Sequence, residues 1–437
     1  MSGGGAGRRQ GVGGAGEDDR DAVIVVGGGA AGVGAALAAA EVGRRVCLVL
    51  GGAGASALSG GAVDWVDWEL GTGAGLGLGG LGLGDGAGGA EFVLDLYRVP
   101  VGGVVLATVS GILRPAAGAD WGLLDVKGLG RGTVLVPRAE HHEWDAVTLS
   151  RSWGDTEIAR AGGLQFQAAD ATILRFREER TLGHADIAAR HDEPARLGWL
   201  AERLREALAR SGPCVAVLLP PWLGLDAPRA EALSERVGLP CGEAASALAS
   251  PAGRRFERAR DRALLRANVT VVRGWVQRIA HDASGWRAHL EGGASLDGSS
   301  IVLAAGGLVG GGLAYEPGDL HANAEIAAAP ARQAFRVTIA SPGTVGAYGR
   351  PLELPGSLFG APPESLAWPF APDPVMERAG LLVDEHQRVQ GAPDGLYACG
   401  DLVADAPRTW LEAWRSGVRA GRYERKGGTE RAVRPRT

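Results

Sequence analysis

Residues 22–50 read AVIVVGGGAAGVGAALAAAEVGRRVCLVL, and the organisation of the chain follows from this stretch. The runs 22–26 and 46–50 are short and apolar and contain β-branched residues, which is typical of buried parallel strands. Glycines follow the first run, and the small residues at 35–42 favour a helix that Gly43 would cap at its C-terminus. The stretch therefore predicts a strand–helix–strand unit of a parallel sheet.

The turn of this unit, GGGAAG at 27–32, fits the pattern G-x-G-x-x-G. In a chain with 72 glycines the pattern alone is weak, but here it follows a predicted strand and opens a predicted helix. Gly27 would allow the tight turn, Gly29 would let the backbone approach a pyrophosphate, and Gly32 would let the helix pack close to the sheet. The amides at the start of the helix would bind the phosphates, so we expect a dinucleotide-binding turn.

The second strand of the unit lacks a residue that such units usually carry. That strand normally ends in Asp or Glu, which holds the adenosine ribose. Here Leu50 is followed by Gly51-Gly52, and no carboxylate stands at the strand end. Either the adenosine end of a dinucleotide is held by other groups, or the bound cofactor lacks that end.

Two further segments carry groups suited to the same ligand. The loop GASALSGGAV at 54–63 offers the hydroxyls of Ser56 and Ser59 and could wrap a diphosphate and the edge of a flavin ring. The segment GLYACGD at 395–401 delivers Asp401 at a glycine turn after a short predicted strand. That carboxylate could accept hydrogen bonds from ribityl hydroxyls, and the following helix could aim its N-terminus at a reduced flavin ring. Taken singly, each segment is also compatible with an ordinary polar loop or a solvated strand end.

Taken together, these motifs resemble the two-dinucleotide-binding-domain flavoproteins, in the branch of the fumarate reductase and succinate dehydrogenase flavoproteins. Within that branch the sequence is most similar to one of the two flavoprotein subunits of the anaerobic glycerol-3-phosphate dehydrogenases, the one to which the family assigns FMN. The similarity includes VLLPPWLGL at 217–225 and IVLAAGGLVGGGL at 301–313, so it extends over most of the chain. That subfamily also lacks the ribose carboxylate. The segment after Asp401 and the Gly-rich stretch 71–90 depart from the family pattern, which leaves flavin-ring contacts and substrate access open.

The resemblance implies a Rossmann-like fold and a flavin-dependent oxidoreductase. The implied reaction is the oxidation of glycerol 3-phosphate to dihydroxyacetone phosphate, with hydride transfer from C2 to the flavin. Although the family assigns FMN here, the G-x-G-x-x-G pattern suits FAD better, so FAD is the first expectation and FMN the alternative. The implied partners are a second flavoprotein subunit and a membrane-associated iron–sulfur subunit that passes electrons to quinone.

Three other functions stay open. The chain could be a flavin-binding electron-relay subunit without its own substrate site, which the few His and Lys residues near the motifs favour somewhat. It could also be a flavin oxidoreductase that acts on another small substrate. A nicotinamide-dependent dehydrogenase fits less well, because such folds do not need the Gly400-Asp401 element.

We expect cofactor contacts from all of these segments, namely from Gly27, Gly29, Ala30, Ala31, Gly32, Ser56, Ser59, Gly60, Gly61, Ala305, Gly306, Gly400 and Asp401. His141 and His142 could hold a general base because histidine titrates near neutral pH, although adjacent loop histidines are more often exposed and idle. Arg408 could neutralise a phosphate or a reduced flavin. The six arginines between residues 254 and 266 predict either a solvated, ion-paired helix face or a docking face or clamp for a substrate phosphate.

The fold class that we expect is α/β, with a parallel sheet, a β-meander and an inserted cap region. The flavin-binding domain would comprise residues 21–115, 240–312 and 375–437, and the cap or substrate region residues 116–239 and 313–374. Residues 1–20 are predicted to form a disordered tail, and 71–90 a flexible Gly-rich loop. The patterns also predict strands at 133–137, 214–219, 270–281, 286–290, 300–305 and 395–400, and helices at 195–210, 254–267 and 410–423.

Composition excludes several classes of protein. The net charge of −5 argues against nucleic acid as a partner. The four cysteines fit no zinc or iron–sulfur spacing, so we expect no metal site here and any iron–sulfur centre on a partner chain. The uncharged run 22–40 resembles a spanning segment, but acidic residues precede it and its glycines are ordered, so we predict no transmembrane segment. The expected location is the cytoplasm, or the inner face of the plasma membrane through a partner subunit.

Overall fold

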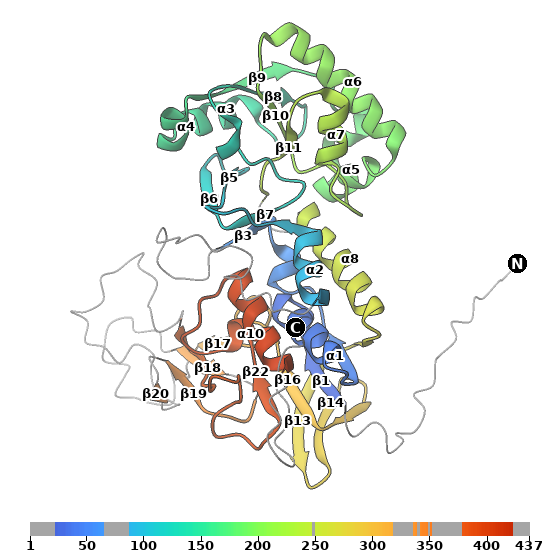
Figure 1. The fold of residues 1–437 in the computed structure, drawn as a ribbon, viewed down its shortest axis with the longest axis vertical. Coiled ribbons are helices and arrows are strands. Elements are labelled where there is room, and N and C mark those ends of the chain that lie inside the picture. The colour runs from blue at the N-terminus through green and yellow to red at the C-terminus, as the bar shows by residue number, and fades with distance from the viewer. Residues whose placement is uncertain are drawn as a thin grey trace, which may run out of the picture.

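The computed structural model describes residues 22–64, 87–246, 250–317, 335–338, 341–347, 350–351 and 378–422. The predicted tail 1–20 and residues 71–86 of the predicted Gly-rich loop lie outside these ranges. Within them the chain forms two parallel sheets, each flanked by helices, and Figure 1 shows these sheets at opposite ends of the molecule. No helix among the described residues is long and apolar enough to cross a membrane.

The first sheet has five parallel strands in the order β12, β2, β1, β16 and β22. The strands are β1 (Val23–Val26), β2 (Val46–Leu50), β12 (Thr270–Arg273), β16 (Ser300–Leu303) and β22 (Leu396–Ala398). The three central strands are runs of mostly buried apolar residues, as a sheet covered on both faces requires. The predicted parallel sheet and its strand–helix–strand unit are therefore confirmed.

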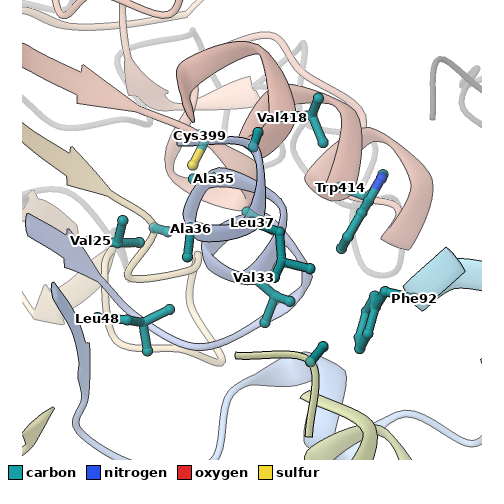
Figure 2. Close-up of a cluster of buried hydrophobic side chains, with 14 of the residues drawn as sticks. Val25, Val33, Ala35, Ala36, Leu37, Leu48, Phe92, Cys399, Trp414 and Val418 are labelled. Atoms are coloured by element: carbon teal, nitrogen blue, oxygen red, sulfur yellow. The ribbon is translucent and has the colours of Figure 1, made fainter. Parts of the chain in front are cut away.

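Four helices pack beside this sheet: α1 (Ala30–Glu41), α2 (Ala87–Leu96), α8 (Pro251–Arg266) and α10 (Trp410–Arg422). Figure 2 shows the core that they share with the strands, in which Val33 and Leu37 of α1 lie near Phe92 of α2 and Trp414 of α10. The rings of Phe92 and Trp414 stack with their centroids 5.3 Å apart. The core thus joins residues from the beginning, the middle and the end of the chain.

Two predicted boundaries were wrong near this core. Helix α1 begins at Ala30 rather than at residue 35. Its glycines lie so close to neighbouring backbone atoms that a side chain would not fit there. A Cβ on Gly34, for example, would lie 2.9 Å from the carbonyl oxygen of Trp414. Residues 87–90, which we assigned to a flexible loop, instead begin α2. Burial of Phe92 in the core stabilises that helix despite the low helix propensity of its glycines.

A β-meander lies between β12 and β16 of the first sheet in chain order, and its presence confirms the predicted meander. It consists of β13 (Val276–Asp282), β14 (Gly285–Leu290) and β15 (Ser295–Gly298), which pair antiparallel. The single strand predicted at 270–281 is two strands, since β12 pairs in parallel with β2 and β13 pairs with β14. The bridge Gly274-Trp275 carries the chain from the first sheet into the meander.

The second sheet is also parallel and has the order β11, β10, β8 and β9. Its strands are β8 (Gly132–Arg138), β9 (Leu164–Asp170), β10 (Ala216–Leu219) and β11 (Cys241–Glu243). The helices between them are α3 (Ala146–Gly154), α4 (Glu157–Gly162), α5 (His184–Arg190), α6 (Pro194–Ser211) and α7 (Ala230–Val237). The inserted region therefore has a parallel sheet and a core of its own, and its role as a cap stays a prediction.

Shorter elements connect the two sheets and complete the described chain. They are the strands β3 (Ala62–Val63), β4 (Tyr97–Arg98), β5 (Val104–Ala107), β6 (Leu113–Ala116), β7 (Gly118–Asp120), β17 (Ala314–Pro317), β18 (Phe335–Thr338), β19 (Val345–Ala347), β20 (Arg350–Pro351) and β21 (Gly380–Leu381). The 3-10 turns are η2 (Ala55–Leu58), η4 (Lys127–Leu129), η5 (Arg177–Thr181) and η8 (Gly400–Leu402).

A buried ionic cluster links the two ends of the molecule. Arg255 of α8 donates hydrogen bonds to Asp120 of β7 at 2.7 and 3.1 Å, to Glu243 of β11 at 2.7 Å and to the carbonyl oxygen of Gly224 at 2.6 Å. The side chains of all three ionisable residues are at most 1% exposed. Burial raises the pKa of Glu243 against the effect of Arg255. Burial alone would lower the pKa of Arg255, but Asp120 and Glu243 raise it above its ordinary value.

Replacing Arg255 by Met should destabilise the protein by about 3–5 kcal/mol, because two buried carboxylates lose their only cationic partner in the cluster. Arg258→Met is the control, since Arg258 is half exposed and pairs with Asp226 at the surface; its cost should stay below about 1 kcal/mol. Denaturant unfolding of both variants measures the difference, and equal losses would contradict the proposed importance of the cluster. Adding Asp120→Asn and Glu243→Gln to Arg255→Met should restore part of the lost stability.

Helices α1 and α10 should separate if Gly417 receives a side chain. A Cβ on Gly417 would lie 2.0 Å from the carbonyl oxygen of Ala31, so Gly417→Ala should cost about 1–3 kcal/mol despite the better helix propensity of Ala. Gly154→Ala is the matched control at the end of α3, where a Cβ would have nothing within 4 Å. The control should leave the thermal midpoint unchanged or raise it slightly. A Gly417 variant as stable as the wild type would refute the close packing.

Candidate functional site

A cavity lies at the carboxyl edge of the first sheet. Its wall is formed by the ends of the parallel strands and by the loops that follow them, in the ranges 26–31, 49–56, 274–279, 303–306, 310–312 and 399–402. The expected site residues that line it are Gly27, Gly29, Ala30, Ala31, Ser56, Ala305, Gly306, Gly400 and Asp401. This edge is where open α/β sheets place their ligands. The fold thus brings nine expected residues from four separate segments into one cavity.

The glycine turn has the geometry of a phosphate cradle. Gly27 has a φ of +111°, and a Cβ there would lie 2.2 Å from the carbonyl oxygen of Ala304. A Cβ on Gly32 would lie 1.9 Å from the carbonyl oxygen of Gly27. Gly32 therefore packs directly against the backbone of the turn and does not line the cavity. Gly29 is the N-cap of α1 and supplies no side-chain cap. Ala30 and Ala31 of the first turn line the cavity, and the amides at a helix start have no intrahelical acceptors.

Ser56 is positioned to assist this turn. The backbone N–H of Ala30 donates a hydrogen bond of 2.9 Å to Ser56 Oγ. Because that oxygen accepts a hydrogen bond from Ala30, the hydroxyl of Ser56 can still donate a hydrogen bond to a phosphate oxygen. A Cβ on Gly29 would come no closer than 3.4 Å to this hydroxyl, so the space in front of the turn is open.

The second half of the same loop has a different role from the one expected. Ser59, Gly60 and Gly61 do not line the cavity, and we do not place them in the site. Ser59 Oγ accepts from the amide of Gly61 at 3.1 Å, and a Cβ on Gly60 would lie 2.1 Å from the oxygen of Ser246. These residues join the loop to the chain that precedes α8. The sequence pattern could not separate them from Ser56, because hydroxyls and glycines occur in both halves.

Asp401 lies in the turn η8, which follows the edge strand β22 and lines the cavity beside Ala31 of α1. Burial raises the pKa of Asp401, and nearby Arg408 lowers it. Arg408 itself donates to the carbonyl oxygen of Ala379 at 3.0 Å, so it lies beside the Asp401 turn, as its sequence position suggested. The loop of Gly307 is close, since a Cβ there would lie 2.9 Å from Cβ of Asp401. The carboxylate is therefore half-buried in the cavity wall, where it can accept hydrogen bonds from hydroxyl groups.

The helix that follows Asp401 begins at Trp410, as predicted, and ends at Arg422. Residues 403–409 form a loop between the carboxylate and this helix. Ala413 in the first turn of α10 still lines the cavity, and Ser416 Oγ accepts from the amide of Gly400 at 2.9 Å. Cys399 is fully buried beside α1, as Figure 2 shows, and burial raises the pKa of its thiol to about 12. A packed thiol fits this environment better than a redox role.

The two histidine candidates lie elsewhere in the molecule. His141 and His142 follow β8 of the second sheet and do not line the cavity of the first sheet. His141 is buried, and its Nε2 lies 2.9 Å from the carbonyl oxygen of Leu182. Burial lowers the pKa of His141. A role as general base for chemistry in the first cavity is therefore excluded by position, because a base must reach the proton that it removes.

His141, Glu143 and His184 form a cluster whose potential ligand atoms lie within 4.8 Å of one another. The indole N–H of Trp222 donates to His184 Nδ1 at 2.8 Å, and His184 Nε2 lies 3.1 Å from Glu143 Oε2. Because indole can only donate, the proton of neutral His184 must sit on Nε2 and face Glu143. A metal at Nε2 would displace that proton to the indole side. The arrangement therefore favours a hydrogen-bonded chain over a metal site.

Two residues near the cavity were missed by the sequence analysis. Trp275 lines the cavity beside Gly51-Gly52, but we assigned it to the middle of a strand. Arg260 is buried, donates to Asp261 at 2.9 Å and reaches the carbonyl oxygen of Gly28 at 3.4 Å. Of the other arginines in this helix, three pair with carboxylates at the surface, namely Arg254, Arg258 and Arg266. The ion-paired face is therefore the better interpretation of the arginine series.

Acidification should destabilise the loop of Trp222 through His191. This histidine is fully buried, its Nδ1 donates to the carbonyl oxygen of Trp222 at 2.9 Å, and burial together with Arg196 lowers its pKa to about 4. Its contribution is complete above about pH 6.5 and is lost as the pH falls towards about 4, since the unfolded chain then binds the additional proton. Over this window the loss amounts to about 3 kcal/mol.

His191→Asn keeps a donor for the carbonyl but cannot titrate in this range. The free energy of unfolding of this variant should therefore fall less than that of the wild type between pH 7 and pH 4, when both are measured with denaturant. Parallel curves for the two proteins would show that His191 does not carry this dependence.

No family model and no curated protein match the chain. Among solved structures, the chain is similar to glycine oxidase from Geobacillus kaustophilus, with 16% identity over 66% of this chain and 55% of that chain and a TM-score of 0.25. It is also similar to L-amino acid deaminase from Proteus myxofaciens, with 16% identity over 66% of this chain and 46% of that chain and a TM-score of 0.26. The chain spans about half the length of these two proteins. Scores of this size assign neither fold nor activity to this chain.

Proposed function

We propose that this chain is a flavin-dependent oxidoreductase that binds FAD in the cavity of the first sheet. The observation that carries the proposal is the meeting of the glycine turn 27–31 with Asp401 in one cavity. A diphosphate needs the first group and a polyhydroxy chain attached to it needs the second. A structural glycine turn would not require a half-buried carboxylate in the same cavity.

The extent of the cavity favours FAD over FMN. The wall continues from the glycine turn in two directions, towards 303–312 and Asp401 on one side and towards 51–54 and Trp275 on the other. FMN would fill the space on the Asp401 side of the turn only. FAD carries groups on both sides of its pyrophosphate and would also occupy the second arm of the cavity.

The residues of the chain would hold FAD as follows. The backbone amides of the glycine turn and the hydroxyl of Ser56, which itself accepts from the Ala30 amide, would bind the pyrophosphate, and Asp401 would accept hydrogen bonds from ribityl hydroxyls. The glycines at 306 and 310–312 keep the opposite wall free of side chains, so that a planar ring can approach the backbone. When bound, the flavin supplies the hydride acceptor.

The substrate follows from the sequence resemblance alone. We propose a glycerol-3-phosphate dehydrogenase type of reaction, in which the C2 hydride of glycerol 3-phosphate passes to the flavin and the hydroxyl proton is lost to give dihydroxyacetone phosphate. A second flavoprotein subunit and a membrane-associated iron–sulfur subunit would carry the electrons to quinone. The chain would then be a peripheral subunit on the cytoplasmic side of the membrane.

One observation favours a second candidate, the electron-relay subunit without its own substrate site. Among the residues that the structure describes, no histidine or lysine lines the cavity. Arg278 and Asp401 are the only ionisable side chains in its described wall apart from the buried thiol of Cys399, and Asp401 is assigned to the cofactor. Anaerobic addition of glycerol 3-phosphate to the purified, flavin-loaded chain distinguishes the candidates. Bleaching of the flavin supports the dehydrogenase, whereas bleaching by dithionite alone supports the relay subunit.

Gly29→Glu should abolish flavin retention while the protein stays folded. A side chain fits at this position, since the nearest atom to a Cβ is Ser56 Oγ at 3.4 Å, but its carboxylate would repel a pyrophosphate at the cradle. Gly128→Glu is the matched control, because it adds the same charge at an open position outside the cavity. Flavin absorbance of the purified variants is the measurement. Full retention in Gly29→Glu would refute the assigned phosphate turn.

A further inference from the structure

Trp275 combines exposure with a fixed position. Its side chain is 55% exposed, although large aromatic side chains normally bury most of their surface. The backbone around it is held on both sides. The amide of Gly274 donates to the oxygen of Leu50 at 2.9 Å, and the amide of Glu291 donates to the oxygen of Trp275 at 2.8 Å. The indole is therefore presented from a bridge anchored to the end of β2 and to the meander.

The indole ring lies against the diglycine that follows β2. A Cβ on Gly51 would be 2.9 Å from both Cδ2 and Cε3 of Trp275, and a Cβ on Gly52 would be 3.2 Å from its Cζ2. Side chains at these two positions would collide with the ring. The missing carboxylate at the strand end and the tryptophan are thus two parts of one arrangement, since the ring lies against the positions where that carboxylate would start.

We propose that Trp275 is the platform on which the adenine ring of FAD stacks, in place of a carboxylate that would hold the adenosine ribose. This inference rests on the proposed function and deepens it. Strands β2 and β12 are parallel neighbours, so the diglycine and Trp275 lie at the same edge of the sheet. The adenosine end of a dinucleotide reaches this edge beyond the second strand. Trp275 lines the same cavity as the glycine turn, on the side away from Asp401.

Stacking suits this position for a physical reason. A base offers a flat apolar face, and an exposed indole in a cavity loses its contact with water when the base covers it. Gly51 and Gly52 place no side chain between the indole and the backbone. The base can therefore cover the part of the indole that stays exposed in the cavity. The arrangement contacts adenosine and leaves the flavin ring untouched. It should therefore discriminate FAD from FMN.

The test compares three ligands on the full chain freed of bound nucleotide, namely FAD, FMN and ADP. Trp275→Ala should weaken FAD and ADP binding by about tenfold to a hundredfold and change FMN binding by less than about twofold. Trp275→Phe should keep most of the FAD affinity, because a smaller aromatic ring still stacks. Trp121→Ala is the matched control, since Trp121 is 44% exposed and lies outside the cavity; it should change none of the three.

The outcomes separate this inference from the proposed function. Equal losses of FAD and FMN affinity in Trp275→Ala, or no loss of FAD and ADP affinity, would overturn the stacking platform and leave flavin binding intact. A wild type that binds neither flavin would overturn the proposed function. If that wild type nevertheless bound ADP in a Trp275-dependent manner, the adenosine platform would stand for another nucleotide.

Discussion

Backbone contact without intervening side chains is the constraint on which this molecule is built. At Gly27, Gly32 and Gly417 a single Cβ would lie 1.9 to 2.2 Å from a neighbouring carbonyl oxygen. These contacts pack α1 closely against α10 and against the ends of the neighbouring strands β1 and β16. Because the same approach brings the start of α1, with Ser56 bonded to its Ala30 amide, to the wall of the cavity, the packing that stabilises the sheet also forms the candidate anion cradle.

The ends of the molecule are held together by a different kind of interaction. Arg255 lies between Asp120 and Glu243 with all three side chains buried. Helix α8, which packs beside the first sheet, is therefore bonded to β7 and to β11 of the second sheet. Such a cluster contributes little net stability compared with apolar packing, but it penalises any arrangement that separates its members. It therefore specifies how the two parallel sheets are joined more than how strongly each one is folded.

The two arms of the cavity divide recognition of the cofactor between different residue types. On one side of the glycine turn a half-buried carboxylate, Asp401, meets a wall of glycines that a planar ring can approach. On the other side an aromatic ring, Trp275, lies on a diglycine. Since the described wall contains no histidine or lysine, the cavity is better equipped to hold a redox group than to move a substrate proton. This imbalance is what keeps the relay subunit a serious candidate.

The sequence by itself determined the strand–helix–strand unit, its glycine turn, most strands of the first sheet and the strands β8 and β10 of the second, because those features follow from local apolar patterns and glycine positions. It also indicated Ser56, Gly306 and Asp401, whose motifs are short and contiguous. Only the tertiary structure decided that residues 270–281 divide between two sheets, that residues 87–90 are helical, and that His141 lies away from the cavity. It alone placed Trp275 on Gly51-Gly52. The reason is physical: these outcomes depend on contacts between segments far apart in the chain, and no local pattern records which distant segment will provide the neighbour.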